Sequence, residues 1–539
     1  MERKSKRTYL WEALALVIIL TILAAMAIPN FLKFQAKAKD QVHRPLYQPR
    51  LSYPAPIPPS PAYPPAHGGS VPPNAVPYDA MFFESQGVNP FIDTDDDWVS
   101  TFAVDVDTAS YTISRKYLFN GHLPPQEAVR VEEFVNYFKY DYPIPSQDTF
   151  SISLEGLPSP FGGENYHLLR IGIQGQEVDV GEQKNAVLTL VIDVSGSMSR
   201  ENRLEMVKQA IHILLDQLGR GDQVGVVVFN TTGRVLLDHL GMAEKRTILR
   251  AIDGLYPDGS TNTDEGLRLG FQLADAHFRE GAINRVILLS DGVANEGTTD
   301  AEGILDKIEW YASRGIALTT IGFGLGNYND VLMEKLADQG DGNYAYVDTL
   351  EEAKRVFDDN LVATLQIIAK DVKVQLEFNR EVVSRYRLIG YENRDLKDKD
   401  FRNNRRDAGE IGAGHQVTAL YEFKLHPKPL RDWVASVTLR SHDPAREGIV
   451  KEQNQKLMFW ELKGTFAVAS PNTKLAAAAA EFAEILRKSY WAREGSLEAV
   501  IEVLQDLPRE FQRRPEVREL IDLVNLAKSL QGSYTFDQD

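Results

Sequence analysis

The sequence AVLTLVIDVSGSMS, residues 186–199, gives the clearest indication of how this chain folds. Its first eight residues are apolar apart from Thr189 and the final Asp193. A continuous apolar run of this length predicts a strand buried on both faces, as in a parallel sheet covered by helices. Ligands of such sheets bind beyond the carboxyl ends of the strands. The D-x-S-x-S pattern of Asp193, Ser195 and Ser197 can therefore turn three oxygens toward one point.

Strands and helices alternate along the chain that follows this stretch. The spacing of leucines and other apolar residues predicts a helix over 203–218. Further buried strands are predicted at 223–229, 285–292 and 316–324, with helices near 264–277, 300–314 and 329–338. This alternation predicts an α/β fold: a doubly wound, mainly parallel, Rossmann-like sheet over residues 184–362.

Two more strand-end loops offer oxygen ligands at the same edge of the predicted sheet. The loop DGSTNT contains Thr261 just before a helix, and the strand at 285–292 ends in Asp291. Hard cations such as Mg²⁺ prefer oxygen ligands and readily keep bound water. An aspartate at a strand end is often a helix cap, and Asp291 alone would be explained that way. Together with Asp193, Ser195 and Ser197, these residues indicate a metal site.

This set of residues resembles the metal-ion-dependent adhesion site of the von Willebrand factor A (VWA) family. The resemblance implies that Ser195, Ser197 and Thr261 are hydroxyl ligands, whereas Asp193 and Asp291 act mostly through bound water. It also implies Mg²⁺ as the ion, with Mn²⁺ or Ca²⁺ as alternatives. The partner would be a protein or surface polymer whose Asp or Glu carboxylate completes the coordination of the ion.

The sequence around the VWA region resembles a bacterial envelope subgroup of this family. In that subgroup the VWA domain lies between a characteristic N-terminal segment and a C-terminal β-rich domain. The similar stretches include STFAVDVDTASY, RVEEFVNYFKYDYP, LLRIGIQG and DAGEIGAGHQVTALYE. They imply an envelope protein but do not imply which partner it binds.

The N-terminus predicts a membrane anchor. Residues 3–7 are rich in Lys and Arg, and residues 13–32 are uncharged and mostly apolar. About 20 residues of helix span roughly the 30 Å of a bilayer core. The basic end predicts a cytoplasmic N-terminus. We therefore expect a single-pass protein of the bacterial inner membrane, with its bulk periplasmic or extracellular. A signal peptide cleaved after residues 25–27 and a buried soluble helix are the alternatives.

The same segment also resembles the N-terminal helix of type IV pilins. Glu12, Pro29 and the stretch AIPNFLKFQAKAK stand in the order found in that family. Arg7 and Thr8, however, stand where pilins have Gly and usually Phe. The resemblance implies an alternative function, that of a pilin-like subunit carrying a VWA head on a surface fibre.

Composition and pattern divide the chain into six parts. These are the basic segment and helix (1–43), a proline-rich linker (44–88), an N-terminal α/β segment (89–183), the VWA domain (184–362), a β-rich domain (363–465) and a C-terminal helical region (466–539). Segments 150–180 and 370–440 share the alternating pattern of half-buried strands. Because lone strands would leave open edges, we predict that both segments join one β-sandwich into which the VWA domain is inserted.

The remaining features exclude several classes of function. A net charge of −17 argues against a nucleic-acid partner. The absence of cysteine excludes disulfides, zinc–thiolate sites and cysteine nucleophiles. The ten histidines are scattered, contain no H-E-x-x-H motif and are predicted to be surface or core residues. No serine-nucleophile motif or placed general base is found, so we expect a binding protein and not an enzyme.

Two acidic stretches offer weaker metal candidates. The sequence DTDDD at 93–97 lacks the glycine and glutamate of an EF-hand, and a solvated turn is the preferred interpretation. Asp105 and Asp107 alternate on a predicted strand and so share a face. A second cation between these two residues is an alternative to a structural role.

Overall fold

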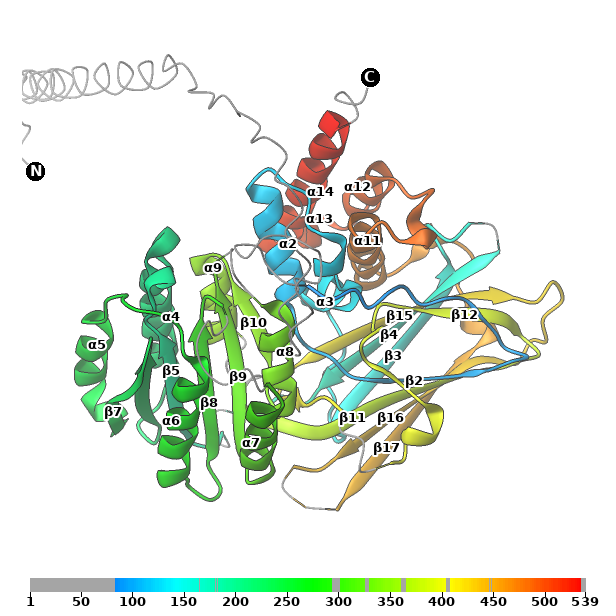
Figure 1. The fold of residues 1–539 in the computed structure, drawn as a ribbon. Coiled ribbons are helices and arrows are strands. Elements are labelled where there is room, and N and C mark those ends of the chain that lie inside the picture. Colours follow the sequence, from blue (N-terminus) through cyan, green and yellow to red (C-terminus); the bar gives the residue numbers. More distant parts are fainter. Residues whose placement is uncertain are drawn as a thin grey trace, which may run out of the picture. The chain divides into compact units, whose positions relative to one another are not determined.

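The computed structural model describes residues 83–534, except for 164, 180, 182, 293–300, 325–328, 360–364, 404–407, 445 and 447. The predicted membrane helix, its pilin-like features and most of the proline-rich linker lie outside these residues. Within the described part, no helix is long and apolar enough to cross a bilayer. Figure 1 shows an α/β unit, two β-sheets and a group of helices.

A six-stranded sheet forms the centre of the α/β unit, in the order β10-β9-β8-β5-β6-β7. Neighbouring strands are parallel, except that β7 runs antiparallel to β6 at one edge. The strands are β5 (Ala186–Asp193), β6 (Gln223–Phe229), β7 (Gly233–Gly241), β8 (Ile283–Ser290), β9 (Ile316–Phe323) and β10 (Tyr344–Val347). The predicted doubly wound, mainly parallel sheet is confirmed. The order of strands reverses between β5 and β8, so this is the point where a ligand is expected.

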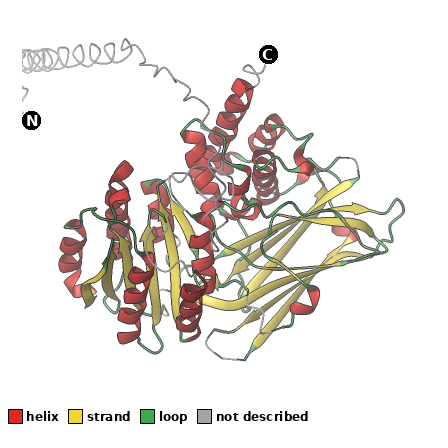
Figure 2. Cartoon of the chain, viewed as in Figure 1, coloured by secondary structure: helices red, strands yellow, loops and turns green. Residues whose placement is uncertain are grey.

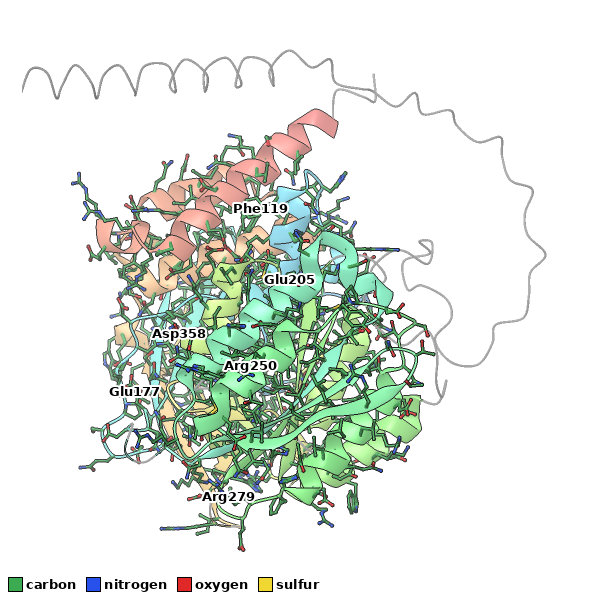
Figure 3. All side chains as sticks on the ribbon, turned by 90° about the vertical axis from the view of Figure 1, so that its left-hand side faces the viewer. Phe119, Glu177, Glu205, Arg250, Arg279 and Asp358 are labelled. Atoms are coloured by element: carbon green, nitrogen blue, oxygen red, sulfur yellow. The ribbon has the colours of Figure 1, made fainter. Side chains whose placement is uncertain are left out.

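Helices cover both faces of this sheet (Figure 2). One face carries α4 (Arg203–Gln217), α5 (Lys245–Asp253) and α9 (Leu350–Lys354), and the other carries α6 (Thr263–Ala276), α7 (Ala301–Ser313) and α8 (Asp330–Gln339). Alternate residues of β5 serve the two faces, because Leu190 packs in the first core and Val191 in the second. Glu205 on α4 and Arg250 on α5 lie on the exposed side of these helices (Figure 3).

Two antiparallel sheets pack face to face around a second core. The first has the order β1-β12-β15-β4-β3, and the second β13-β2-β11-β16-β17 with β14 beside β11. Their bounds are β1 (Ile92–Asp93), β2 (Val99–Ala103), β3 (Phe150–Pro158), β4 (Tyr166–Gly175), β11 (Ile367–Phe378), β12 (Val383–Ile389), β13 (Asp395–Leu396), β14 (Ile411–Gly412), β15 (Gln416–Leu425), β16 (Trp433–His442) and β17 (Val450–Met458). Residues such as Ile171 from the first sheet and Val374 from the second share one apolar core, which defines a β-sandwich.

The α/β unit is inserted into this sandwich, as predicted. Strand β4 precedes the α/β unit and β15 follows it, yet the two strands pair from Tyr166–Lys424 to Gln174–Gln416. In the second sheet, β2 from before the insertion pairs with β11 from after it. Both sheets therefore contain strands from both sides of the inserted unit.

A helical layer covers the outer face of the first sheet. It contains α2 (Ala109–Phe119), α3 (Val131–Asn136), α11 (Pro471–Leu486), α12 (Leu497–Gln505), α13 (Arg509–Gln512) and α14 (Pro515–Tyr534). On β4, Leu168 faces this layer, whereas Leu169 faces the interior of the sandwich. The predicted C-terminal helices are thus joined by two helices from the N-terminal segment in one core.

Candidate metal centre

Asp193 ends strand β5 at the point where the strand order reverses. Its side chain is fully buried. One carboxylate oxygen accepts a hydrogen bond from the backbone N–H of Ser195 at 2.8 Å, and the other accepts one from the Ser290 hydroxyl at 2.6 Å. Burial, with a smaller contribution from the Asp291 carboxylate, raises the pKa of Asp193 to about 7. A cation bound beside Asp193 would offset the cost of burial and favour its ionised form.

The two serines bring the first and third loops together. The Ser195 and Ser197 hydroxyl oxygens lie 3.0 Å apart, and the Ser197 hydroxyl donates to Asp291 Oδ1 at 2.9 Å. Ser195 and Asp291 are buried, whereas Ser197 is half-buried. Oxygens from the ends of β5 and β8 therefore converge, as the sequence predicted.

Thr261 is placed beside this pair of loops by the backbone. The N–H of Gly196 donates to the Gly259 carbonyl at 2.9 Å, and the N–H of Asp258 donates to the Val194 carbonyl at 2.8 Å. Thr261 itself is buried and precedes α6. Within the described residues, no hydrogen bond joins its hydroxyl to the other four side chains. The structure thus places Thr261 in the neighbouring loop without a hydrogen bond to those side chains.

Two residues of this centre were missed by the sequence analysis. Ser290 supports Asp193, as described above. Arg203, the first residue of α4, forms a buried ion pair with Asp291, with 2.6 Å between Nη1 and Oδ2. Gly324 makes room for this arginine, because an added Cβ would overlap its side chain. The position of Arg203 directly after the serine loop could have indicated a role at this site. In the sequence, however, Arg203 also fits the pattern of an ordinary amphipathic helix.

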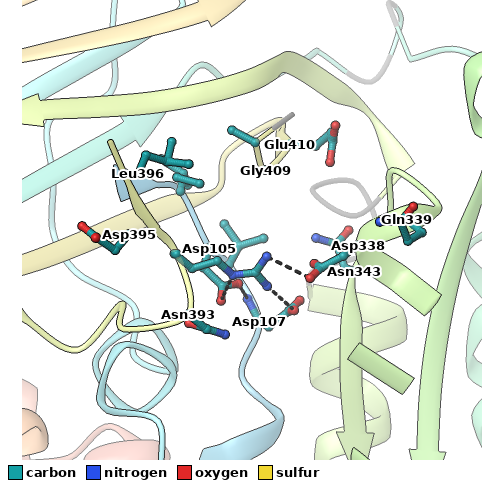
Figure 4. A pocket seen from close by; sticks show the side chains of 16 residues that line it. Asp105, Asp107, Asp338, Gln339, Asn343, Asn393, Asp395, Leu396, Gly409 and Glu410 are labelled. Atoms are coloured by element: carbon teal, nitrogen blue, oxygen red, sulfur yellow. Dashed lines mark hydrogen bonds and ion pairs between the residues drawn. The ribbon is translucent and has the colours of Figure 1, made fainter. Parts of the chain in front are cut away.

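The second acidic candidate, Asp105 and Asp107, has a protein cation as its partner. Arg394 Nε lies 3.0 Å from Asp105 and its Nη2 lies 3.8 Å from Asp107. Arg394 also pairs with Asp338 of α8 at 3.0 Å, and these acids line a polar pocket of about 450 Å³ (Figure 4). The Arg394 guanidinium therefore supplies positive charge at the position where the sequence left a second metal ion open as an alternative. In the DTDDD stretch, Asp93 ends β1 and residues 94–96 form the expected turn.

Comparison with known proteins agrees with this fold. The family model described as von Willebrand factor type A domain matches residues 188–359, and a model described as von Willebrand factor matches residues 77–170. The protein is therefore a VWA-domain protein, a class whose members commonly bind a divalent metal. A third model, for the C-terminal region of the uncharacterized protein YfbK, matches residues 363–530.

A match over most of the chain gives a more specific assignment. The protein YfbK of Escherichia coli (strain K12) is 34% identical over 454 residues, which cover 79% of this chain and 78% of that protein. The chain belongs to the YfbK family. The protein sll0103 of Synechocystis is 31% identical over 189 residues, 35% of this chain and 44% of that protein. A von Willebrand factor type A structure from Catenulispora acidiphila covers 69% of this chain and 89% of its own at 15% identity, with a TM-score of 0.43.

Proposed function

We propose that this protein is a membrane-anchored adhesion protein of the bacterial envelope that uses Mg²⁺ to capture an acidic group. Asp193, Ser195, Ser197, Thr261 and Asp291 would hold the ion, and Mn²⁺ or Ca²⁺ are alternative ions. The partner would be a protein or surface polymer with an accessible Asp or Glu side chain. The observation that carries this proposal is the position of the Ser197 hydroxyl, which lies 3.0 Å from the Ser195 hydroxyl and 2.9 Å from Asp291 Oδ1.

The donor set fits a cation that keeps affinity for an outside anion. Hydroxyl ligands are neutral, so they compensate little of the charge of a divalent ion. Of the two carboxylates, Asp291 already has its negative charge neutralised by Arg203. A bound Mg²⁺ would supply an electron-poor centre that accepts one more oxygen. The partner's carboxylate is the group best suited to that position.

Binding without catalysis is the activity that we propose. Asp193 accepts hydrogen bonds on both oxygens, and Asp291 contacts Ser197 with one oxygen and Arg203 with the other. Both carboxylates are thus engaged by protein donors that hold them in place, which favours a role in positioning bound water over that of a general base. A hydrolase would need such a base.

The proposed location is the inner membrane, with the N-terminus in the cytoplasm. It rests on the basic and apolar segments of residues 1–32, which lie outside the described part of the structure. The proline-rich linker that follows would hold the VWA unit away from the bilayer, because such chain is extended. The net charge of −17 supports the absence of a nucleic-acid partner.

Titration of the full chain with Mg²⁺ tests the metal site. In Ser195→Ala we expect at least a tenfold weaker affinity, as is typical of changes around a metal ion. Ser199→Ala is the matched control, because the Ser199 hydroxyl is exposed and bonds only to the Gly196 carbonyl in the described structure. No uptake by the wild type, or equal uptake by both variants, would refute the metal site.

A second measurement tests partner capture. Wild type and Ser195→Ala are immobilised and exposed to envelope extract with Mg²⁺ or with EDTA. We expect a partner that the wild type retains only with Mg²⁺ and that Ser195→Ala does not retain. Mg²⁺ uptake without any metal-dependent retention would support the ion but contradict adhesion.

A further inference from the structure

A second cluster of metal-binding side chains lies in the α/β unit, apart from the five residues described above. Asp238 and His239 belong to the edge strand β7, and His277 follows the last residue of α6. One imidazole nitrogen of each histidine and one oxygen of Asp238 lie within 4.8 Å of one another. His277 Nε2 is 2.6 Å from Asp238 Oδ1, and the two imidazole rings are 4.5 Å apart.

A β-bulge brings the two neighbouring residues of β7 together. The register shifts between Val224 and Val226, so that Asp238 and His239 both oppose the single residue Gly225 of β6. Successive side chains of a regular strand point to opposite faces, and a bulge changes this direction. Gly225 also makes room for the imidazole, because an added Cβ would lie 2.7 Å from its Cε1 atom.

The two ring nitrogens of His239 have different surroundings. Its Nε2 lies 3.2 Å from the Thr189 hydroxyl of β5. Its Nδ1 is buried and has no hydrogen-bond partner among the residues that the structure describes. A histidine that binds a metal through one nitrogen is usually held by a hydrogen bond at the other. The contact with Thr189 therefore has the form of such a support.

We propose that Asp238, His239 and His277 bind a divalent transition-metal ion of the Zn²⁺ type. Two imidazoles and one carboxylate are a common set of three protein ligands for zinc, with water in the fourth position. Mg²⁺ prefers oxygen ligands alone, so the two sites of the α/β unit would select different ions. The Asp238 side chain is 70% exposed, which leaves a path from solvent.

The bound ion would tie the edge strand β7 to the end of α6. An antiparallel edge strand leaves unpaired backbone groups and is held by its neighbour on one side only. Thr261 precedes the N-terminus of the same helix, and His277 lies beyond its C-terminus. The proposed zinc would thus fix the far end of the helix that begins beside the Mg²⁺ loops.

Titration of the full chain with Zn²⁺ in a large excess of Mg²⁺ tests this site, because the excess keeps Zn²⁺ from the oxygen-rich centre. We expect uptake of one equivalent by the wild type. Asp238→Asn and His277→Ala should each weaken Zn²⁺ affinity at least tenfold, because each removes one of three ligands. Both residues are partly exposed, so these variants are expected to fold.

The control is His212→Ala, which removes a half-exposed histidine that pairs with Asp253 at 2.8 Å and lies outside the proposed zinc site. Its Zn²⁺ affinity should equal that of the wild type. Absence of uptake under excess Mg²⁺ would show that Asp238 and His277 form an ion pair only. Uptake that survives both Asp238→Asn and His277→Ala would equally overturn the proposal. Neither result depends on the Mg²⁺ site, which the Ser195→Ala titration tests separately.

Discussion

Glu481 of α11 is a buried acid whose surroundings favour the neutral form. Burial, together with the carboxylates of Glu484 and Glu422, raises its pKa to about 8 against an ordinary value of 4.5, although Arg387 opposes this shift. The folded state therefore holds the proton more tightly than the unfolded chain does. The contribution of Glu481 to stability is full below about pH 4.5 and is lost as the pH rises through about 8.

Replacing Glu481 by Gln should remove this dependence on pH. We expect the free energy of unfolding of Glu481→Gln, relative to the wild type, to increase by a few kcal/mol as the pH rises through this range. Urea unfolding at a series of pH values measures it. Glu484→Gln, one helical turn away, should behave oppositely. Although burial opposes them, Arg487 and Arg387 lower the pKa of Glu484, so its loss should destabilise the protein at neutral pH. If stability depends on pH in the same way in both variants, the opposite pKa shifts of Glu481 and Glu484 are incorrect.

At the residue scale, the sequence predicts the candidate metal ligands better than the residues that hold those ligands in place. The spacing of Asp193 and Ser195, with a strand before them, was sufficient to predict the convergence of oxygens. Arg203 and Ser290 fitted a helix and a strand equally well, and their side-chain direction depends on tertiary contacts. His239 and His277 are far apart in sequence, and only the bulge in β7 and the packing of α6 bring them together.

At the scale of elements, α6 packs closely against the central strand that carries Asp193. Gly270 faces β5, and a Cβ added there would overlap the Val191 side chain. An alanine in a helix interior normally gains about 1 kcal/mol over glycine. Here the overlap with a packed core should cost about 1–3 kcal/mol.

We therefore expect Gly270→Ala to lower the free energy of unfolding by up to about 2 kcal/mol, despite the higher helix propensity of alanine. Chemical denaturation gives this value. Gly254→Ala is the control, because Gly254 has a right-handed helical conformation and an added Cβ would lie no closer than 3.4 Å to its neighbours. Its effect should be below about 0.5 kcal/mol. If Gly270→Ala stabilises the protein, the close approach of α6 is incorrect.

The elements that the sequence predicts well are those buried on both faces. Strands β5, β6, β8 and β9 are continuous apolar runs, and α4 has a clear apolar side. Strand β7 was missed because most of its residues are only partly buried, as expected for an edge. Strand β17 was also missed, since it is a largely polar, exposed edge. Edge strands lack the periodic burial from which a strand is predicted.

At the scale of the whole molecule, the inserted α/β unit is held by more than its two chain connections. Helix α2 lies between this unit and α14. Arg115 of α2 bonds to Asp348 through Nε at 3.0 Å, to Glu352 at 3.0 Å and to Glu519 of α14 at 2.9 Å. The predicted insertion could be inferred from matching strand patterns, whereas this contact could not, because it joins three segments distant in sequence. The arginine and its two acids from the α/β unit are almost fully buried.

Replacing Arg115 by Met should therefore be strongly destabilising. Asp348 and Glu352 would remain buried without this partner, and loss of one member of a buried ion pair typically costs about 3–5 kcal/mol. Because the pair joins the α/β unit to the helical layer, we also expect thermal unfolding to separate into two transitions. Calorimetry of the full chain measures both effects. Arg268→Met removes an exposed pair with Glu265 on α6 and should cost no more than about 1 kcal/mol, in one transition. Should Arg115→Met match that small loss, Arg115 would not be what couples the inserted unit to the rest of the molecule.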